Sequence, residues 1–144
     1  MRIIIQDPLP GEDESAIISV KKMTDRITRA INLLKSPDDL TVYEDNQALM
    51  LPVSAVFYVE SVEQKTFVYA EKAVYRSRLK LYEIEDILSA GDFLRISKQI
   101  IVSVRKIRNV APAGAGRFAA KLINGETVII SRQFVPALKE RFGL

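Results

Sequence analysis

Cysteine and histidine are both absent from the 144 residues of this chain. Without cysteine there is no disulfide, no thiol nucleophile and no thiolate metal site. Without histidine the chain lacks the commonest general base and the commonest transition-metal ligand. Carboxylates are the main acid–base groups that remain. We therefore expect no enzyme, no metal and no cofactor, with no small-molecule substrate evident.

Long apolar runs are missing as well. The run of three isoleucines at 3–5 is bounded by Arg2 and by Asp7 with Pro8, whereas a membrane helix needs about 20 apolar residues. No basic start followed by an apolar stretch and small residues marks a signal peptide. We therefore expect a cytoplasmic protein without membrane insertion. The 48% hydrophobic content is sufficient for a sizeable core.

Charge is unevenly distributed along the chain. Residues 1–92 hold 11 Lys/Arg against 16 Asp/Glu, a net charge of −5, and residues 93–144 hold 10 against 2, a net charge of +8. Such asymmetry is typical of a part that faces nucleic acid or another anionic surface. An ordinary solvated basic face would give the same count, and charge alone leaves both interpretations open.

Residues 1–39 are predicted to form a small β/α extension. Its β-branched residues predict strands at 2–6 and 16–20, separated by prolines and Gly11. Thr24 is the expected N-cap of a helix that Pro37 stops. The helix would carry an apolar face, made of Ile27, Ile31 and Leu34. A unit this small needs a partner surface, and we expect it to be a possible dimerisation element.

Residues 40–144 show short strands joined by tight turns. Hairpins are predicted at 40–51, 56–70 and 118–131, the last around Asn124-Gly125. Further strands are expected at 74–78, 93–96 and 100–104. One helix is predicted over 79–88 with Gly91 at its end, and another over 133–142 with Pro136 in its first turn. This pattern predicts an α+β, mostly β, domain. Gly114 and Gly116 lie between strands and indicate a turn, not a phosphate loop.

Basic residues gather at the expected strand ends and loops of this domain. The clusters are Arg95 to Gln99, Arg105 to Arg108, Arg117 with Lys121, and Ser131 to Gln133. Arginine and lysine neutralise phosphates, and glutamine or lysine side chains read base edges in the major groove. The clusters are therefore candidates for nucleic-acid contact, although part of the charge could simply solubilise the face.

The order of the motifs resembles the LytTR family of DNA-binding domains over about residues 40–143. Phe93 to Ile107 resembles the central signature of the family, and Val128 to Lys139 its closing "SR" segment. Val56 to Ser61 and Leu79 to Leu88 are similar to the family's upstream strand and helix. The chain departs from the family at three positions: Ser103 where asparagine is usual, Gln99 where serine or threonine is common, and Ser97 near a frequent histidine.

This resemblance implies stacked antiparallel β-sheets of about ten strands, with a mid-domain and a C-terminal helix. It also implies loops that enter successive major grooves of double-stranded DNA at paired repeats, and a possible homodimer. The contacts that the resemblance implies are Gln64, Lys65, Thr66, Ser97, Lys98, Gln99, Arg132 and Gln133. We add Arg105 from the basic run, which makes nine expected DNA contacts. Family members often carry a receiver domain of roughly 120 residues, which residues 1–39 are too short to form.

Two interpretations of individual features stay open at the level of sequence. Arg95 lies inside a strand, where it could contact DNA or pair with a carboxylate such as Glu60. The domain as a whole could bind DNA, or it could be a protein-interaction or anti-regulator module that retains the fold, with an interrupted or covered basic face. An enzyme that depends on carboxylates alone is a more remote alternative.

Overall fold

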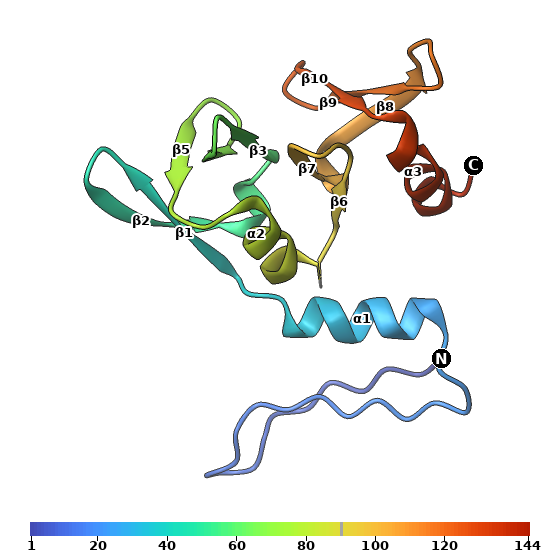
Figure 1. Ribbon diagram of the computed structural model, residues 1–144. Coiled ribbons are helices and arrows are strands. Elements are labelled where there is room, and N and C mark those ends of the chain that lie inside the picture. The colour runs from blue at the N-terminus through green and yellow to red at the C-terminus, as the bar shows by residue number, and fades with distance from the viewer. Residues whose placement is uncertain (90) are drawn as a thin grey trace.

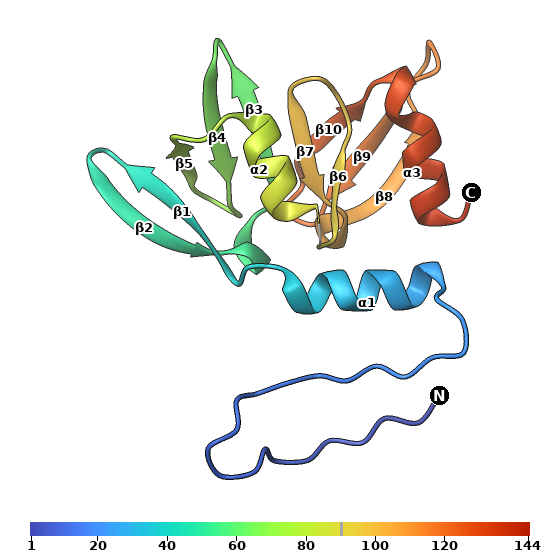
Figure 2. The ribbon, with the colours of Figure 1, turned by 60° about the horizontal axis from the view of Figure 1, so that its bottom comes forward.

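The computed structural model describes residues 1–89 and 91–144 (Figure 1). Residues 1–24 run out and back beneath the first helix as extended chain without strands, so the two strands predicted at 2–6 and 16–20 are wrong (Figures 1 and 2). The excursion reverses at a turn in which the Glu12 amide donates to the Leu9 carbonyl. Gly11 takes φ +85° there, which follows Pro10 as in a type II turn. Isoleucine favours strands, but a strand forms only where a second strand completes its hydrogen bonds.

Helix α1 spans Asp25–Lys35, as predicted. The Thr24 side chain caps it by accepting a hydrogen bond from the Ile27 amide at 3.3 Å. Of the expected apolar face, Ile27 is buried, Ile31 is half-buried and Leu34 is 67% exposed. The last turn of α1 and the segment after it border a cavity of about 680 Å³ against the β-domain, lined in part by Leu33, Pro37, Val53, Leu88 and Phe93.

A sheet of seven antiparallel strands forms the larger part of the domain. In chain order its strands are β1 (Asp39–Glu44), β2 (Gln47–Pro52), β3 (Tyr58–Val62), β4 (Lys65–Tyr69), β5 (Val74–Ser77), β6 (Phe93–Arg95) and β7 (Ile100–Ser103). Their spatial order is β2-β1-β5-β4-β3-β7-β6. The hairpins predicted at 40–51 and 56–70 are confirmed by the β1–β2 and β3–β4 pairs.

Helix α2 (Leu81–Leu88) covers one face of this sheet. Its first turn is closed by Glu83, whose carboxylate accepts from the Lys80 amide at 3.0 Å. Ile84 and Leu88 are buried in a core with residues from four strands of the sheet, namely Leu40, Val42, Val59, Val68 and Ile101. The helix ends at Leu88 with Ser89 as its C-cap, two residues before the glycine that the sequence predicted as its terminator.

A second sheet of three strands packs on the other face of the first, at the β6–β7 side. Its strands are β8 (Ile107–Pro112), β9 (Phe118–Leu122) and β10 (Thr127–Ile130), in the order β10-β9-β8. Helix α3 (Val135–Phe142) closes the core between the sheets, with Leu138 fully buried beside Ile96, Val102 and Ile130. The described residues thus contain the predicted ten or so strands in stacked antiparallel sheets, with the two expected domain helices. No helix in these residues is long and apolar enough to cross a membrane.

Candidate nucleic-acid interface

Three loops meet at one edge of the β-domain, on the side opposite α1 (Figure 2). They are the β3–β4 hairpin, the β6–β7 loop and the junction between β10 and α3. Main-chain hydrogen bonds hold them together: the Ser61 amide donates to the Gln99 carbonyl, and the Ser131 amide donates to the Ile96 carbonyl, both at 2.8 Å. The β6–β7 loop is therefore the centre of this loop edge, fixed to β3 on one side and to the end of β10 on the other.

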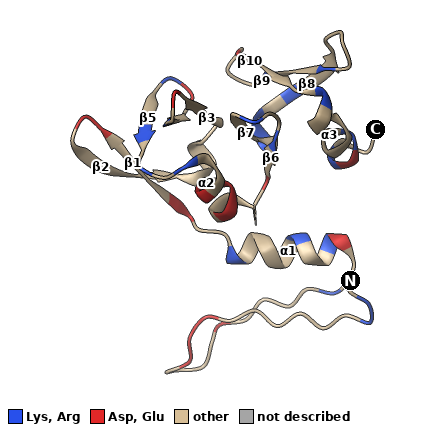
Figure 3. Ribbon diagram, in the orientation of Figure 1, with Lys and Arg blue, Asp and Glu red and all other residues tan. Residues whose placement is uncertain are grey.

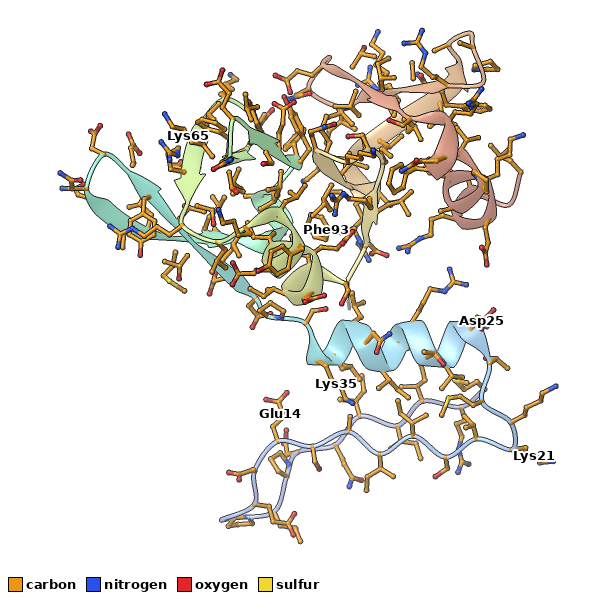
Figure 4. The ribbon with its side chains drawn as sticks, in the orientation of Figure 1. Glu14, Lys21, Asp25, Lys35, Lys65 and Phe93 are labelled. Carbon is orange, nitrogen blue, oxygen red and sulfur yellow. The ribbon has the colours of Figure 1, made fainter. Side chains whose placement is uncertain are left out.

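The β3–β4 hairpin turns through two residues, Glu63 and Gln64, with φ values of 50° and 65°. Positive φ at both positions is the geometry of a type I′ turn, whose twist matches that of the flanking strands. Gln64 and Lys65 are exposed at this tip. Thr66, also an expected contact, is only 3% exposed, so its side chain points into the domain and is not free to touch a ligand. Figure 4 places Lys65 far from α1, whose ends are marked by Asp25 and Lys35.

The β6–β7 loop presents Lys98 and Gln99 to solvent. Ser97, the third expected contact of this loop, is only 7% exposed, and its hydroxyl accepts a hydrogen bond from the Gln99 amide at 3.1 Å. Ser97 therefore shapes the loop from within, as serine does in tight turns. The two side chains that are free to bind a ligand follow directly after it.

Arg95 supports this loop from inside the domain. Its guanidinium donates to the carbonyls of Ser97 and Lys98, and it pairs with the Glu85 carboxylate of α2 at 3.1 Å. Glu60, the partner suggested from sequence, accepts instead from the Tyr69 hydroxyl at 3.3 Å, so that pairing is wrong. The arginine therefore anchors the loop to α2, and each of its three guanidinium nitrogens donates a hydrogen bond within the protein.

Arg132 and Gln133 lie exposed in a short 3₁₀ turn, Arg132–Phe134, between β10 and α3. The aliphatic part of Arg132 passes over Gly116 of the β8–β9 turn. A Cβ added to that glycine would come within 2.8 Å of the Arg132 Cδ. Gly116 also has φ +76°, a conformation that residues with a side chain rarely adopt. The sequence indicated only a flexible turn there, and the role of Gly116 in seating Arg132 has no signal in the sequence.

Arg105 lies at the other end of β7, away from the loop edge, in the 3₁₀ turn Val104–Lys106. It pairs with Asp92 at 2.6 Å, and Asp92 also binds Arg141 of α3. Burial alone would raise the pKa of Asp92, but the two arginines outweigh it and hold that pKa below its ordinary value. Of the nine residues expected to contact DNA, the structure brings eight to the loop edge and leaves Arg105 out.

The charge of the loop edge suits an anionic ligand. Lys65, Lys98 and Arg132 are exposed, and none of them pairs with a carboxylate within the described residues. Glu63 is an exposed acidic residue of the β3–β4 tip, and most other acidic residues lie elsewhere, on α2, at the β1–β2 turn and in the N-terminal excursion (Figure 3). Residues 1–89 and 91–144 contain no group of acidic side chains arranged to hold a metal ion. The arrangement offers cations and amides for binding an anionic, hydrogen-bonding partner.

The chain belongs to the LytTR family, since the model of the LytTr DNA-binding domain matches residues 46–143. A solved LytTr DNA-binding domain from Bacillus cereus, part of a protein described as a methyl-accepting/DNA response regulator, superposes with a TM-score of 0.71. It is 27% identical and covers 76% of this chain and 100% of that one.

Curated relatives are similar at the same level. The transcriptional regulatory protein YpdB of Escherichia coli CFT073 is 25% identical over 92 residues, which are 64% of this chain and 38% of YpdB. The chain thus spans well under half the length of that relative. An HTH-type transcriptional regulator of Staphylococcus aureus MRSA252 is 28% identical over 138 residues, 93% of both chains.

Proposed function

We propose that this chain is a sequence-specific transcription regulator that binds double-stranded DNA in the cytoplasm through the loop edge, without catalytic activity. The observation that carries the proposal is the convergence of exposed polar and basic side chains from three loops that main-chain hydrogen bonds hold together. The family match and the regulatory relatives support the same conclusion. A protein-interaction module that had lost DNA contact would have an interrupted or covered basic face, whereas Lys65, Lys98 and Arg132 are exposed here.

The exposed side chains divide into two kinds. Lys98 and Arg132 carry charges suited to phosphates or to the acceptor edge of guanine, and the glutamines Gln64, Gln99 and Gln133 offer the paired donor and acceptor that match adenine. Because Thr66 and Ser97 are buried, we assign them to shaping the loops and not to contact. A DNA-binding domain of this kind inserts loops, rather than a helix, into the major groove.

Fluorescence anisotropy with the DNA upstream of the chain's own operon, measured across a salt series, tests this function. We expect tighter binding to that DNA than to scrambled DNA and a steep salt dependence, because each neutralised phosphate contributes about 0.9 to the slope of log K against log salt. Lys98→Glu and Arg132→Glu should abolish binding. Lys72→Glu, an exposed lysine at the opposite end of the β4–β5 hairpin, is the matched control. Equal affinity for operator and scrambled DNA would count against the function. Binding that survives both loop variants would count against the assigned contacts.

Residues 1–39, before the β-domain, are proposed to dimerise the protein so that two copies read paired repeats. The excursion exposes a set of large apolar side chains, namely Met1, Ile3, Ile4, Ile5, Leu9, Ile17, Ile18, Val20 and Met23. These expose on the order of 1,000 Å² of apolar surface, comparable with the ~800 Å² per partner that a standard interface buries. Its extended limbs also leave main-chain groups unpaired, which a second copy could complete as strands.

Analytical ultracentrifugation of the full chain and of a chain without residues 1–39 tests this role. We expect the full chain to dimerise in the micromolar range and the shorter one to sediment as a monomer. If both sediment as monomers, with or without DNA, residues 1–39 do not dimerise the protein.

A further inference from the structure

The face of the large sheet opposite α2 is covered by the small sheet only on the β6–β7 side. Over β1, β5 and β4 it stays open, and arginine and aromatic side chains alternate across it. Register fixes this placement, because Arg76 of β5 lies opposite Phe67 of β4 on one side and Tyr43 of β1 on the other. Val68 and Tyr75, which alternate with these residues, face the α2 core instead.

Two arginines of this face are stacked on aromatic rings. The Arg78 guanidinium carbon lies 3.9 Å from the centre of the Tyr43 ring, and that of Arg76 lies 5.2 Å from the centre of the Phe67 ring. Both arginines are exposed, both rings are half-buried, and neither guanidinium pairs with a carboxylate of the described chain. An aromatic ring below a guanidinium fixes the orientation of the guanidinium plane through cation–π attraction, while the N–H groups at the edge of that plane stay free to donate.

The arrangement differs from that of the arginines that stabilise the fold. Arg95, Arg105 and Arg141 each bind a carboxylate, which uses the hydrogen-bonding edge of the guanidinium. Stacking orders Arg76 and Arg78 without using that edge, and it reduces the side-chain entropy that a later contact would cost. Such pre-ordered, unpaired guanidinium groups are suited to bidentate hydrogen bonding with an oxyanion such as a phosphate.

The stacked pair lies at the same end of the sheet as the loop edge. Thr66, at the start of β4, pairs with Ser77, so the end of β5 lies beside the β3–β4 hairpin. β5 is three strands from β7 in the sheet, a distance of about 14 Å at the usual strand spacing. That distance is similar to the ~12 Å width of the major groove of B-DNA. A β6–β7 loop seated in the groove would place β5 near the sugar–phosphate strand that borders it.

We propose that Arg76 and Arg78 bind phosphates of the duplex beside the groove that the loops enter, which extends the interface onto the open face of β5. This inference rests on the proposed DNA-binding function. Single-stranded nucleic acid is a poorer fit, because a protein that binds it stacks bases on aromatic rings and here the guanidinium groups occupy those rings. The contact carries no base recognition and strengthens binding to every sequence alike.

Salt-dependent anisotropy of Arg76→Gln, Arg78→Gln and the double variant of the full chain tests the contact. Each single variant should reduce the magnitude of the slope of log K against log salt by about 0.9, and the double variant by about 1.8. The reduction should be equal on operator and scrambled DNA. Lys72→Gln removes the same charge at the opposite end of the β4–β5 hairpin and should leave the slope at the wild-type value. Thermal unfolding of each variant verifies that the sheet is intact.

Arg78→Lys separates charge from geometry. It keeps the cation and should retain the slope, but it should weaken binding severalfold because lysine lacks the planar fork that ring stacking orients. Suppose that Arg76→Gln and Arg78→Gln both keep the salt slope of the Lys72→Gln control, while Lys98→Glu abolishes binding. This result overturns the inference and leaves the proposed function standing. A loss confined to operator DNA would also overturn it. A wild-type chain that binds no DNA would sink both.

Discussion

Gly116→Ala separates the seating of Arg132 from the stability of the turn that carries it. The added methyl would lie 2.8 Å from Cδ and 2.9 Å from Cγ of Arg132, closer than real side-chain contacts allow. Because the Arg132 side chain is exposed, it can move aside with little effect on the fold. It then loses its position at the loop edge beside Gln133. The expected result is weaker DNA binding by a chain that still folds.

The magnitude follows from the contact that is displaced. A well-placed arginine contact to a base is worth about 1–3 kcal/mol, so we expect affinity to fall by about 5- to 150-fold, and by no more than Arg132→Ala itself. An alanine at positive φ also destabilises the fold by about 1–2 kcal/mol. Gly114→Ala matches this second effect alone, since Gly114 has φ +83° and nothing within 4 Å of its added Cβ.

Anisotropy binding curves and urea unfolding of the two alanine variants provide the comparison. Both variants should lose similar stability, and only Gly116→Ala should lose affinity. If Gly114→Ala weakens binding as much as Gly116→Ala, then the turn as a whole matters and the seating of Arg132 does not. If Arg132→Ala binds DNA like the wild type, the arginine is not a contact at all.

Three further predictions concern the core and the opposite edge. Asp92→Asn should cost about 1–3 kcal/mol of stability at neutral pH, because Arg141 loses its counterion. Since the pKa of Asp92 is lowered in the folded state, this stabilisation is present above the ordinary aspartate pKa of ~3.9 and is lost as pH falls through the lower folded pKa. A stability difference between wild type and Asp92→Asn that stays constant in acid, measured by urea unfolding, would contradict this. Ile84→Ala, at a fully buried position of α2, should cost about 2–5 kcal/mol by urea unfolding, against less than about 0.5 kcal/mol for Ile123→Ala at a site 48% exposed. Arg105→Gln should leave DNA affinity and its salt slope unchanged in anisotropy, and a loss like that of Lys98→Glu would return Arg105 to the interface.

Most of the β-domain could be predicted because its signals are local. Alternating apolar residues marked the strands, and Asn124-Gly125 marked the β9–β10 hairpin that the structure confirms. Thr24 located the start of α1. The two N-terminal strands could not be predicted correctly from propensity alone, because Ile3 and its neighbours pair with no strand in the part of the chain that the structure describes.

The candidate site was predictable by segment, but less so by side chain. Family motifs located the loops, whereas burial depends on which face of a strand a residue occupies after folding, and this is why Thr66 and Ser97 turned inward. The partner of Arg95 was misassigned for a related reason, since Glu85 approaches it only when α2 packs on the sheet. The stacking of Arg78 on Tyr43 joins residues 35 positions apart, and it follows from sheet topology that no local pattern encodes.

The two main-chain hydrogen bonds that join the loops have a consequence for how such a protein can change its target. Amide and carbonyl groups are the same for every residue except proline, so these ties persist when Lys98 or Gln99 is replaced. A lineage can therefore exchange its reading side chains one at a time while their spacing along the duplex stays constant. Operator sequences would then diverge base by base between related regulators, and the distance between the contacted bases would be the slower character to change.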